Sequence, residues 1–396
     1  MIKGGKGEIM ELFQNAAEKL KKEYQVFLDH LDLNEVQLSE RTEHIGKKDC
    51  FALNSQFNIV CEKYLTSGRT QDYYTVIDFF YFFSVRTDIL QIVKVKGKGL
   101  TVQKSQRYYV FSQMTVMEQY IFMMAVWLGE YQHVLNDRHL LYRGLLASMK
   151  EAKAGASLSD PYEGRVTAPW GSYYFPEIRL FALFQLITIE WLEETIEDKE
   201  NKFRIKELYL TSEGYFWRKL YEKQKKPFWY ILDVDSILPV IMEITEEATD
   251  DMEMKLMHFW ANPVEAGLHT IMLKVVVGSC IRRIKIGDQF TLDDLHYLIQ
   301  ESVAFDMDHL YFFQIGSGTS MKRYFAPECE DEPWAADTIP LAELSLYEGM
   351  RFEYLFDFGD KWRFQITVEQ ILPEHTQEWE ISRVKGEAPE QYEYGW

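Results

Sequence analysis

Two aspartates near the C-terminus stand where carboxylate chemistry could occur. Asp357 and Asp360 flank Phe358 and Gly359 in the stretch YLFDFGDKWRF, residues 354–364. Aromatic residues alternate on both sides, which predicts a β-hairpin with the aspartates in its turn and a positive φ at the glycine. Such carboxylates either cap the turn or, beside imidazole and guanidinium groups, bind a ligand or metal ion.

The ligand-binding interpretation needs further polar side chains from the same part of the chain. The candidates are Arg282, Arg283, His296, His309 and Trp362. With the two aspartates they predict a small pocket that binds a ligand or metal through carboxylate and imidazole groups. The alternative is that the aspartates cap the turn and the arginines neutralise them. No cofactor is predicted on either interpretation.

Several common catalytic motifs are absent from the sequence. Asp-Phe-Gly at 357–359 occurs in protein kinases, but no glycine-rich loop, strand lysine or His-Arg-Asp loop precedes it. The chain has no G-x-x-x-x-G-K-[ST] loop and no G-x-S-x-G elbow, and IGSGTS at 315–320 is typical of a turn between strands, with phosphate binding as a weak alternative. The sequence therefore favours a protein that is not an enzyme.

A second group of candidate residues is basic. The chain carries no acid between Asp88 and Glu118, and its alternating pattern over 91–110, with Gly97 and Gly99 inside it, predicts a two-stranded ribbon. The cations of this segment are Lys94, Lys96, Lys98, Lys104 and Arg107. A basic ribbon beside a helix can contact phosphates, as the wing of a winged-helix protein does, so 91–107 is a candidate nucleic-acid contact. Alternatively, the lysines protect an exposed edge strand or bind an acidic protein partner.

The elements around the ribbon predict an internal duplication. A helix, a two-stranded ribbon and a helix are expected over 72–131. A helix is expected again over 175–194, with a strand and a turn leading into a helix over 202–220, and LTVQKSQRYY (100–109) matches LYLTSEGYFW (208–217) loosely. At 396 residues the chain is expected to form two or three domains. We predict a helical, winged-helix-like unit over 1–150 and a second helical unit with a basic strand, turn and helix over 151–262. Helices are expected at 9–30, 72–88, 114–131, 175–194 and 229–260.

The remaining segment, 268–396, has the pattern of an α+β domain. Thr291 and Asp294 fit a capping box at the start of the clearest helix of the chain, 291–303. A short helical turn is expected within 341–349. Strands are expected at 271–277, 281–287, 309–316 and 321–327, and in a final hairpin over 350–371.

Charge and hydropathy limit the partners of the protein. The net charge is −19, and from His269 onward 11 Lys and Arg face 23 Asp and Glu, which leaves −12 in the C-terminal segment. That segment would suit cations or a basic protein partner rather than nucleic acid. No apolar run approaches the roughly 18 residues that a bilayer span needs, and no secretory signal is visible, so no membrane contact is expected. The cysteines form no C-x-x-C pair, which disfavours zinc and favours a cytoplasmic location.

The C-terminal segment resembles a known family. The stretches LKVVVGSCIRRIKI, TLDDLHYLIQESVAFDMDHLYFFQIG, LYEGMRFEYLFDFGDKWRFQITVEQI and GEAPEQY follow the order of the plasmid pRiA open-reading-frame-three-like family, also met as TnpR-type passenger proteins of insertion elements. Ile281 stands where members often have tryptophan, and Gln391 where a terminal acid is common. The resemblance implies an α+β fold similar to a β-grasp and no established activity. The TnpR-type label suggests recombination, but no serine-recombinase pattern is present.

Three functional hypotheses follow from these observations. The leading one is a non-enzymatic binding or regulatory protein that contacts nucleic acid through 91–107 and is associated with mobile elements. The second is a ligand- or metal-binding domain, or an enzyme, centred on His309, Asp357 and Asp360. The third is a protein-interaction adaptor.

Overall fold

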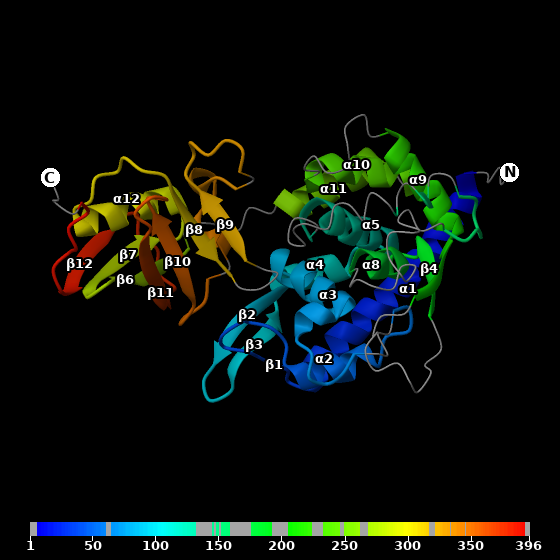
Figure 1. The fold of residues 1–396 in the computed structure, drawn as a ribbon, viewed down its shortest axis with the longest axis horizontal. Helices are drawn as coiled ribbons and strands as arrows, with labels where there is room; N and C mark the ends of the chain where they lie inside the picture. Colours follow the sequence, from blue (N-terminus) through cyan, green and yellow to red (C-terminus); the bar gives the residue numbers. More distant parts are fainter. Residues whose placement is uncertain are drawn as a thin grey trace. The chain divides into compact units, whose positions relative to one another are not determined.

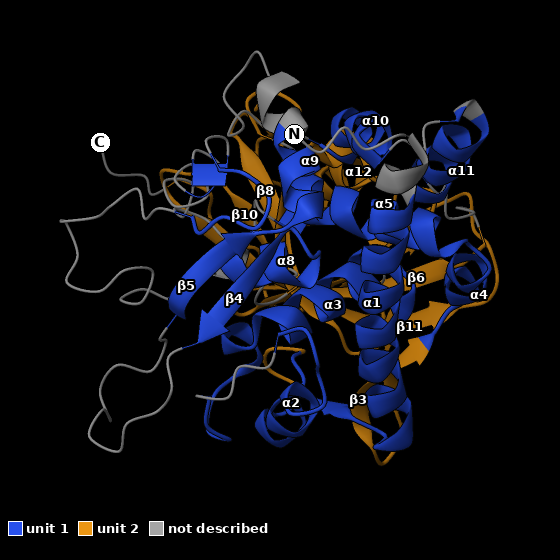
Figure 2. Ribbon diagram, turned by 90° about the vertical axis from the view of Figure 1, so that its right-hand side faces the viewer, with its two compact units in different colours: residues 1–39, 44–90, 104–261 blue, residues 40–43, 91–103, 262–396 orange. Residues whose placement is uncertain are grey.

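The chain forms two compact units. The computed structural model describes residues 6–60, 65–131, 145, 148–149, 152–158, 176–191, 205–223, 233–245, 249–261, 268–316, 321–332, 334–344 and 346–392. Unit 1 comprises residues 1–39, 44–90 and 104–261, and unit 2 comprises residues 40–43, 91–103 and 262–396 (Figure 2). Within the described residues, no helix is long and apolar enough to cross a membrane.

The first part of the chain is built mainly from helices. They are α1 (Lys6–Leu33), α2 (Lys47–Asn54), α3 (Thr75–Arg86), α4 (Gln106–Ser112), α5 (Val116–Val126), α8 (Pro176–Leu183), α9 (Ser212–Lys223), α10 (Val234–Thr245) and α11 (Asp250–Ala261) (Figure 1). A 3₁₀ turn, Gln71–Tyr73, precedes α3, and a π-helical segment, Trp127–Tyr131, continues α5. The helices expected at 9–30, 72–88 and 114–131 are confirmed, and the helical region expected at 229–260 contains the two helices α10 and α11.

Two short sheets accompany these helices. Strands β1 (Gln37–Leu38), β2 (Leu90–Val95) and β3 (Gly99–Lys104) form a sheet in the order β1-β3-β2, and β4 (Ile187–Trp191) pairs with β5 (Ile205–Leu210). The helix expected over 175–194 is therefore wrong in its second half. Apolar and polar residues alternate in Ile187-Thr188-Ile189, and all three are β-branched. This pattern fits a half-buried strand better than a helix.

The two hairpins share one type of junction with their neighbouring helices. Before each hairpin, one residue takes a left-handed conformation, Asp88 (φ 54°) after α3 and Gln185 (φ 60°) after α8. After each hairpin, a hydroxyl at the start of the next helix bonds back to the carbonyl of that left-handed residue: Ser105 to Asp88, and Thr211 to Gln185 at 2.7 Å. This repeated device supports the predicted internal duplication.

The structure corrects the register of that duplication. The sequence comparison placed Ser105 opposite Glu213, whereas the junctions place it opposite Thr211, two residues earlier. The backbone N–H of Ser105 donates to Ile89 O (3.1 Å), and that of Thr211 donates to Leu186 O (3.3 Å), in agreement with the corrected register. The helices preceding the two hairpins, α3 and α8, also pack on each other.

The C-terminal domain, residues 268–392, is an α+β structure. Its helix α12 (Leu292–Val303) packs on one face of a seven-stranded sheet and has the predicted Thr291–Asp294 capping box (Figure 1). The sheet order is β12-β7-β6-β11-β10-β8-β9. The strands are β6 (Thr270–Val277), β7 (Cys280–Gly287), β8 (Tyr311–Ile315), β9 (Lys322–Phe325), β10 (Arg351–Phe356), β11 (Trp362–Leu372) and β12 (Glu380–Lys385), with a 3₁₀ turn at Leu341–Leu344. These strands and the helix confirm the predicted elements of the domain.

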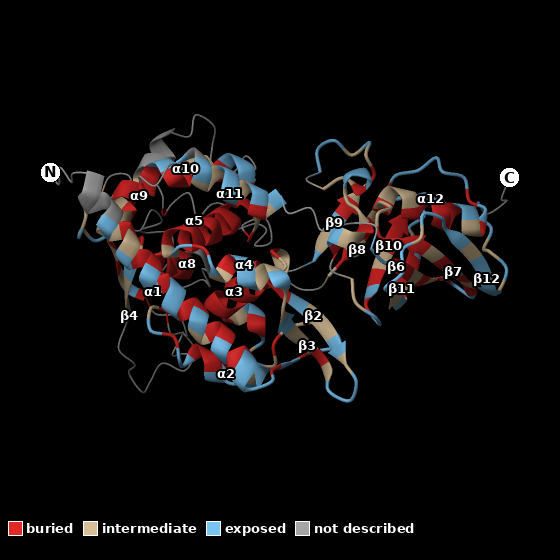
Figure 3. Ribbon diagram, turned by 180° about the vertical axis from the view of Figure 1, so that it is seen from behind, coloured by how far each residue is buried: buried red, intermediate tan, exposed pale blue. Residues whose placement is uncertain are grey.

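The pairing of the strands adds detail to the resemblance. The central strands β6 and β11 are antiparallel, with Val275 opposite Ile366, so this pair differs from the parallel central pair of a β-grasp. The buried face alternates as expected along the final hairpin, where Phe352, Tyr354 and Phe356 of β10 are 4%, 0% and 0% exposed. This face and the apolar face of α12 form the core of the domain (Figure 3).

Candidate binding surfaces

The basic ribbon is a β-hairpin with lysines at its tip. Lys94, Lys96 and Lys98 are exposed, and Lys94 Nζ lies 3.8 Å from a carboxylate oxygen of Glu40, itself largely exposed. An ion pair at this distance between exposed groups is weak, so Lys94 can still interact with an anion. The hairpin tip therefore keeps its positive charge at the surface.

The other two candidate cations have internal partners. Lys104 forms an ion pair with Asp32, and its ammonium group lies 4.5 Å from the centre of the Tyr108 ring. Arg107 belongs to α4 rather than to the ribbon, because the strand ends at Lys104 and Ser105 caps the next helix. Its guanidinium donates to Thr87 O and Phe259 O, both at 2.6 Å, and burial lowers its pKa. The structure thus gives Arg107 a role in packing α4 against α11.

The helix that precedes the ribbon has no surface available for binding. Residues Thr75–Ser84 of α3 are all buried (Figure 3), and the aromatic residues Phe79–Phe83 are among them. Asp78 at its centre accepts hydrogen bonds from Gln71 (2.8 Å) and Tyr131 (2.7 Å). The buried residues of this helix are therefore not available to a ligand.

The turn near Asp357 is shaped by its own carboxylate. Oδ1 of Asp357 accepts the backbone N–H groups of Gly359 (2.7 Å) and Asp360 (3.3 Å). The left-handed conformation falls on Asp357 and Lys361, both with φ 58°, and not on the glycine as expected. A Cβ at the glycine would lie 3.1 Å from Asp357 Oδ1, a tight contact that would need a small shift of that carboxylate. This geometry matches the turn-capping alternative.

One histidine does approach this turn. His309 Nε2 lies 3.5 Å from Asp357 Oδ2 and 3.5 Å from Asp308 Oδ1. Trp362 closes the hairpin opposite Phe356 and packs edge-on against Phe305, with ring centroids 5.0 Å apart. His309, Asp357, Asp360 and Trp362 therefore share one end of the sheet. Among the described residues, no group of three or more His, Cys, Asp or Glu side chains is placed to hold a metal ion.

The two arginines lie elsewhere and have structural partners. Arg282 is 5% exposed and donates to the carbonyl oxygens of Ser302 (2.8 Å), Ile281 (3.1 Å) and Gly386 (3.2 Å), which fastens the chain after β12 to the end of α12. Arg283 forms a two-pronged ion pair with Glu369 on the neighbouring part of the sheet, with Nε–Oε2 at 2.6 Å. The partners of both guanidinium groups in these hydrogen bonds are residues other than Asp357.

His296 belongs to a buried polar network that the sequence did not reveal. Its Nδ1 lies 2.6 Å from the Tyr354 hydroxyl, which also accepts from Gln300 Nε2 at 2.5 Å, and its ring stacks on Tyr311 with centroids 3.9 Å apart. Burial lowers the pKa of His296 to about 4, so the ring is neutral at physiological pH. Burial also raises the pKa of Asp293, which accepts a hydrogen bond from the Tyr311 hydroxyl.

The sequence contained one signal for this network. His296 and Gln300 lie four residues apart on the otherwise apolar face of α12, where two polar side chains must find partners from another element. Which partner they find could not be known without the fold, because Tyr354 is 58 residues away in sequence from His296. The His296 ring and the Tyr354 side chain of this network lie in the core of the domain, 4% and 0% exposed.

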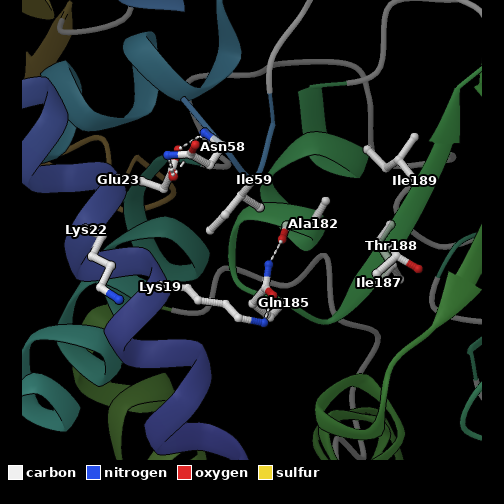
Figure 4. Close-up of a pocket in the computed structure, with 10 residues that line it drawn as sticks. All are labelled: Lys19, Lys22, Glu23, Asn58, Ile59, Ala182, Gln185, Ile187, Thr188 and Ile189. Carbon is white, nitrogen blue, oxygen red and sulfur yellow. Dashed lines mark hydrogen bonds between the residues drawn. The ribbon is translucent and has the colours of Figure 1, made fainter. Parts of the chain in front are cut away.

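A pocket in unit 1 was also missed by the sequence reasoning. It has a volume of about 490 Å³ and lies between α1, residues 58–59 and β4 (Figure 4). Glu23 at its side is 2% exposed, and its carboxylate accepts the backbone N–H of Asn58 (3.0 and 3.1 Å) and the Asn58 side chain (3.2 Å). Burial raises the pKa of Glu23. Lys19 Nζ donates to Gln185 Oε1 at 2.9 Å across the pocket.

The C-terminal domain is, by its architecture, a single helix packed on an antiparallel sheet with a carboxylate-capped hairpin at one end. Residues 268–391 match the family described as Plasmid pRiA4b ORF-3-like protein, which confirms the resemblance found in the sequence for the last third of the chain. The match covers residues 268–391 and does not extend into the preceding 267 residues.

Two similar proteins add to this finding. Uncharacterized protein y4hQ of Sinorhizobium fredii is 28% identical over 102 residues, which cover 24% of this chain and 47% of that protein, so the chain spans about half the length of this relative. A crystal structure of a protein of unknown function from Methanosarcina mazei Go1 is similar over 31% of this chain and 71% of its own, at 22% identity and a TM-score of 0.26. That similarity is too low to support a conclusion about function.

Proposed function

We propose that the protein is a non-enzymatic binding protein whose β2–β3 hairpin contacts the phosphate backbone of nucleic acid. The observation that carries the proposal is the row of exposed lysines at the tip of this hairpin, Lys94, Lys96 and Lys98, in a chain of net charge −19. Lysines placed at intervals along a ribbon can each neutralise one phosphate and release its counterions. A cytoplasmic location and an association with mobile elements remain predictions.

The order of elements around the hairpin supports this proposal. The succession α1, β1, α2, α3, β2, β3 with the sheet order β1-β3-β2 matches the order expected of a winged-helix domain, in which β2 and β3 would form the wing. In such domains the helix in the position of α3 enters the major groove. Here α3 is buried and packs on α8, so contact through the wing would read phosphates and not bases.

The test is binding of the full chain to short DNA and RNA duplexes, measured by fluorescence anisotropy over a range of salt concentrations. The triple substitution Lys94→Glu, Lys96→Glu and Lys98→Glu should abolish binding. For the native protein the logarithm of the affinity should fall with the logarithm of salt concentration, by about 0.9 for each phosphate contact. Two duplexes of unrelated sequence should bind equally well.

A matched control separates the ribbon from overall charge. Lys21, Lys47 and Lys48 are exposed lysines of α1 and α2, and changing all three to glutamate alters the net charge by the same amount. This control should bind nucleic acid nearly as well as the native protein. Equal loss in both triple variants would mean that charge alone is responsible, and unchanged binding in the ribbon variant would exclude the ribbon.

A further inference from the structure

One wall of the pocket in unit 1 is the edge of strand β4 that faces away from β5. Strand β5 is paired on both sides, with β4 on one side and with residues 155–158 on the other, where Leu158 N–H donates to Leu208 O (2.8 Å) and Leu210 N–H donates to Ala156 O (3.0 Å). Strand β4 has only β5 as a partner within the part of the chain that the structure describes. Its outer edge therefore carries N–H and C=O groups of alternate residues that point away from β5.

The lining of the pocket shows that it follows this edge. Ile187, Thr188 and Ile189 are consecutive residues of β4, and all three line the pocket (Figure 4). Successive side chains of a strand point to opposite faces of the sheet, so a pocket on one face would touch alternate residues only. A pocket that touches three in a row lies along the edge itself. Ile59 and Ile189, both partly exposed, give it apolar surface.

The charge around the pocket is positive at its rim. Lys19 and Lys22, exposed residues of α1, line it, and the nearby Glu23 carboxylate is buried and bonded to Asn58. The acid therefore contributes little to the rim, whereas both ammonium groups can reach a negative group in the pocket. An edge strand beside two lysines favours an extended, acidic chain over a small anion, because only an extended chain can pair with successive backbone groups along the edge.

We propose that this pocket binds an extended acidic peptide segment of a partner protein, which adds to β4 as a further strand and places carboxylates beside Lys19 and Lys22. Main-chain hydrogen bonds to β4 supply the affinity, and Ile59 and Ile189 accommodate apolar side chains of the peptide. The site is separate from the lysines of the ribbon, so it stands whether or not the hairpin contacts nucleic acid.

The experiment uses the full chain and a fluorescent synthetic peptide of alternating glutamate and valine, with binding measured by anisotropy. Lys19→Glu combined with Lys22→Glu should weaken binding at least tenfold. The control Lys21→Glu combined with Lys47→Glu changes the net charge equally and should leave binding within twofold. A peptide with lysine in place of glutamate should not bind.

A second probe tests the strand pairing independently of charge. The same peptide with N-methyl groups on every second residue keeps its carboxylates but loses half of its N–H donors, and it should bind at least tenfold more weakly. Equal binding of the methylated and unmethylated peptides would overturn the proposal, as would full competition by citrate at the ionic strength of the buffer. The ribbon variant with Lys94, Lys96 and Lys98 changed to glutamate should keep peptide binding; loss there would place the contact on the ribbon and overturn the β4 site.

Discussion

The hairpins β2–β3 and β4–β5 are built on the same junction and carry different chemistry. Both follow a left-handed residue and both end at a hydroxyl that bonds back to it, Ser105 in one and Thr211 in the other. The first hairpin presents lysines at its tip, whereas in the second Lys206 pairs with Glu190 and is neutralised. The junction bonds go to backbone carbonyl groups, so they do not depend on the side chains of the strands. One hairpin can therefore carry lysines at its tip while the other presents a strand edge.

The largest difference between the copies lies three residues after the cap. Tyr108 occupies this position after Ser105, but Gly214 occupies it after Thr211. A Cβ at Gly214 would lie 2.0 Å from Leu186 O, so the second helix approaches its hairpin too closely for any side chain. We expect Gly214→Ala to destabilise the protein by about 3 kcal/mol, since the clash is with backbone. Denaturant unfolding followed by circular dichroism would measure it.

Gly68→Ala is the matched control for this substitution. A Cβ there would meet nothing closer than the Thr66 hydroxyl at 3.9 Å, so stability should change by less than about 0.5 kcal/mol. If Gly214→Ala were as harmless as the control, the close approach in the second copy would be an incorrect description of the junction.

Substitution of Arg107 should have the next largest effect on stability. It tests a set of bonds that the first copy has and the second lacks. In the corrected register its counterpart is Glu213, which cannot make the same bonds. Arg107→Ala removes two charge-assisted hydrogen bonds to backbone carbonyls and the contact with the Phe259 ring, so we expect a loss of about 2 kcal/mol. Lys96→Ala, an exposed change in the ribbon, should cost less than about 0.5 kcal/mol.

The same variant sharpens the functional comparison. Arg107→Ala should bind nucleic acid as the native protein does at a temperature where both are folded, because its guanidinium faces Thr87 and Phe259 and not solvent. A large loss of nucleic-acid binding with little loss of stability would return Arg107 to the group of contact residues.

Removing either helix cap should lower stability by the same amount, and by less than the loss of the Arg107 side chain. Ser105 accepts the N–H of Arg107 at 2.9 Å, and Thr211 accepts the N–H of Gly214 at 2.9 Å. Replacing either with alanine should cost about 1 kcal/mol, and the double variant should cost about the sum, because the two caps are independent. Thermal and denaturant unfolding of the three variants would measure both terms. A cost at one cap only would show that the two junctions are not equivalent.

Local signals explain what the sequence could predict. The Thr291 capping box and the alternation of Phe352, Tyr354 and Phe356 depend on neighbours a few residues away, so the helix and hairpin of the C-terminal domain could be located within a few residues. The second half of the helix predicted over 175–194 failed because an apolar run that also alternates fits both periods. Only the pairing of β4 with β5 decides between them.

The candidate sites depended on long-range partners and were predicted less well. Arg282 was expected near the Asp357 turn, but its bonds go to carbonyls around residues 302 and 386, which no spacing rule could indicate. His309 and Asp357 do approach each other, because β8 and β10 are adjacent strands. The pocket beside β4 had no signal at all, since its lining comes from segments that are distant in sequence.

The smallest expected effect concerns the pH dependence of the second junction. Glu213 lies at the start of α9, where burial raises its pKa above the usual value of about 4.5 and hydrogen bonds and Lys19 oppose the shift. The folded state therefore holds the proton more tightly than the unfolded state. Its contribution to stability is greatest at acid pH and is lost as the pH rises from about 4.5 through the raised value. Arg107, the counterpart in the first copy, does not titrate in this range.

Glu213→Gln removes this titration while keeping the size of the side chain. We expect the difference in unfolding free energy between Glu213→Gln and the native protein to grow in favour of glutamine as the pH rises from 4 to 7. The comparison needs denaturant unfolding of both proteins at several pH values, with Glu11→Gln, an exposed change on α1, as the control. A difference that shrinks over this range would mean that the carboxylate is stabilised in the fold, so that the acid in the second copy replaces the arginine of the first as a favourable charge.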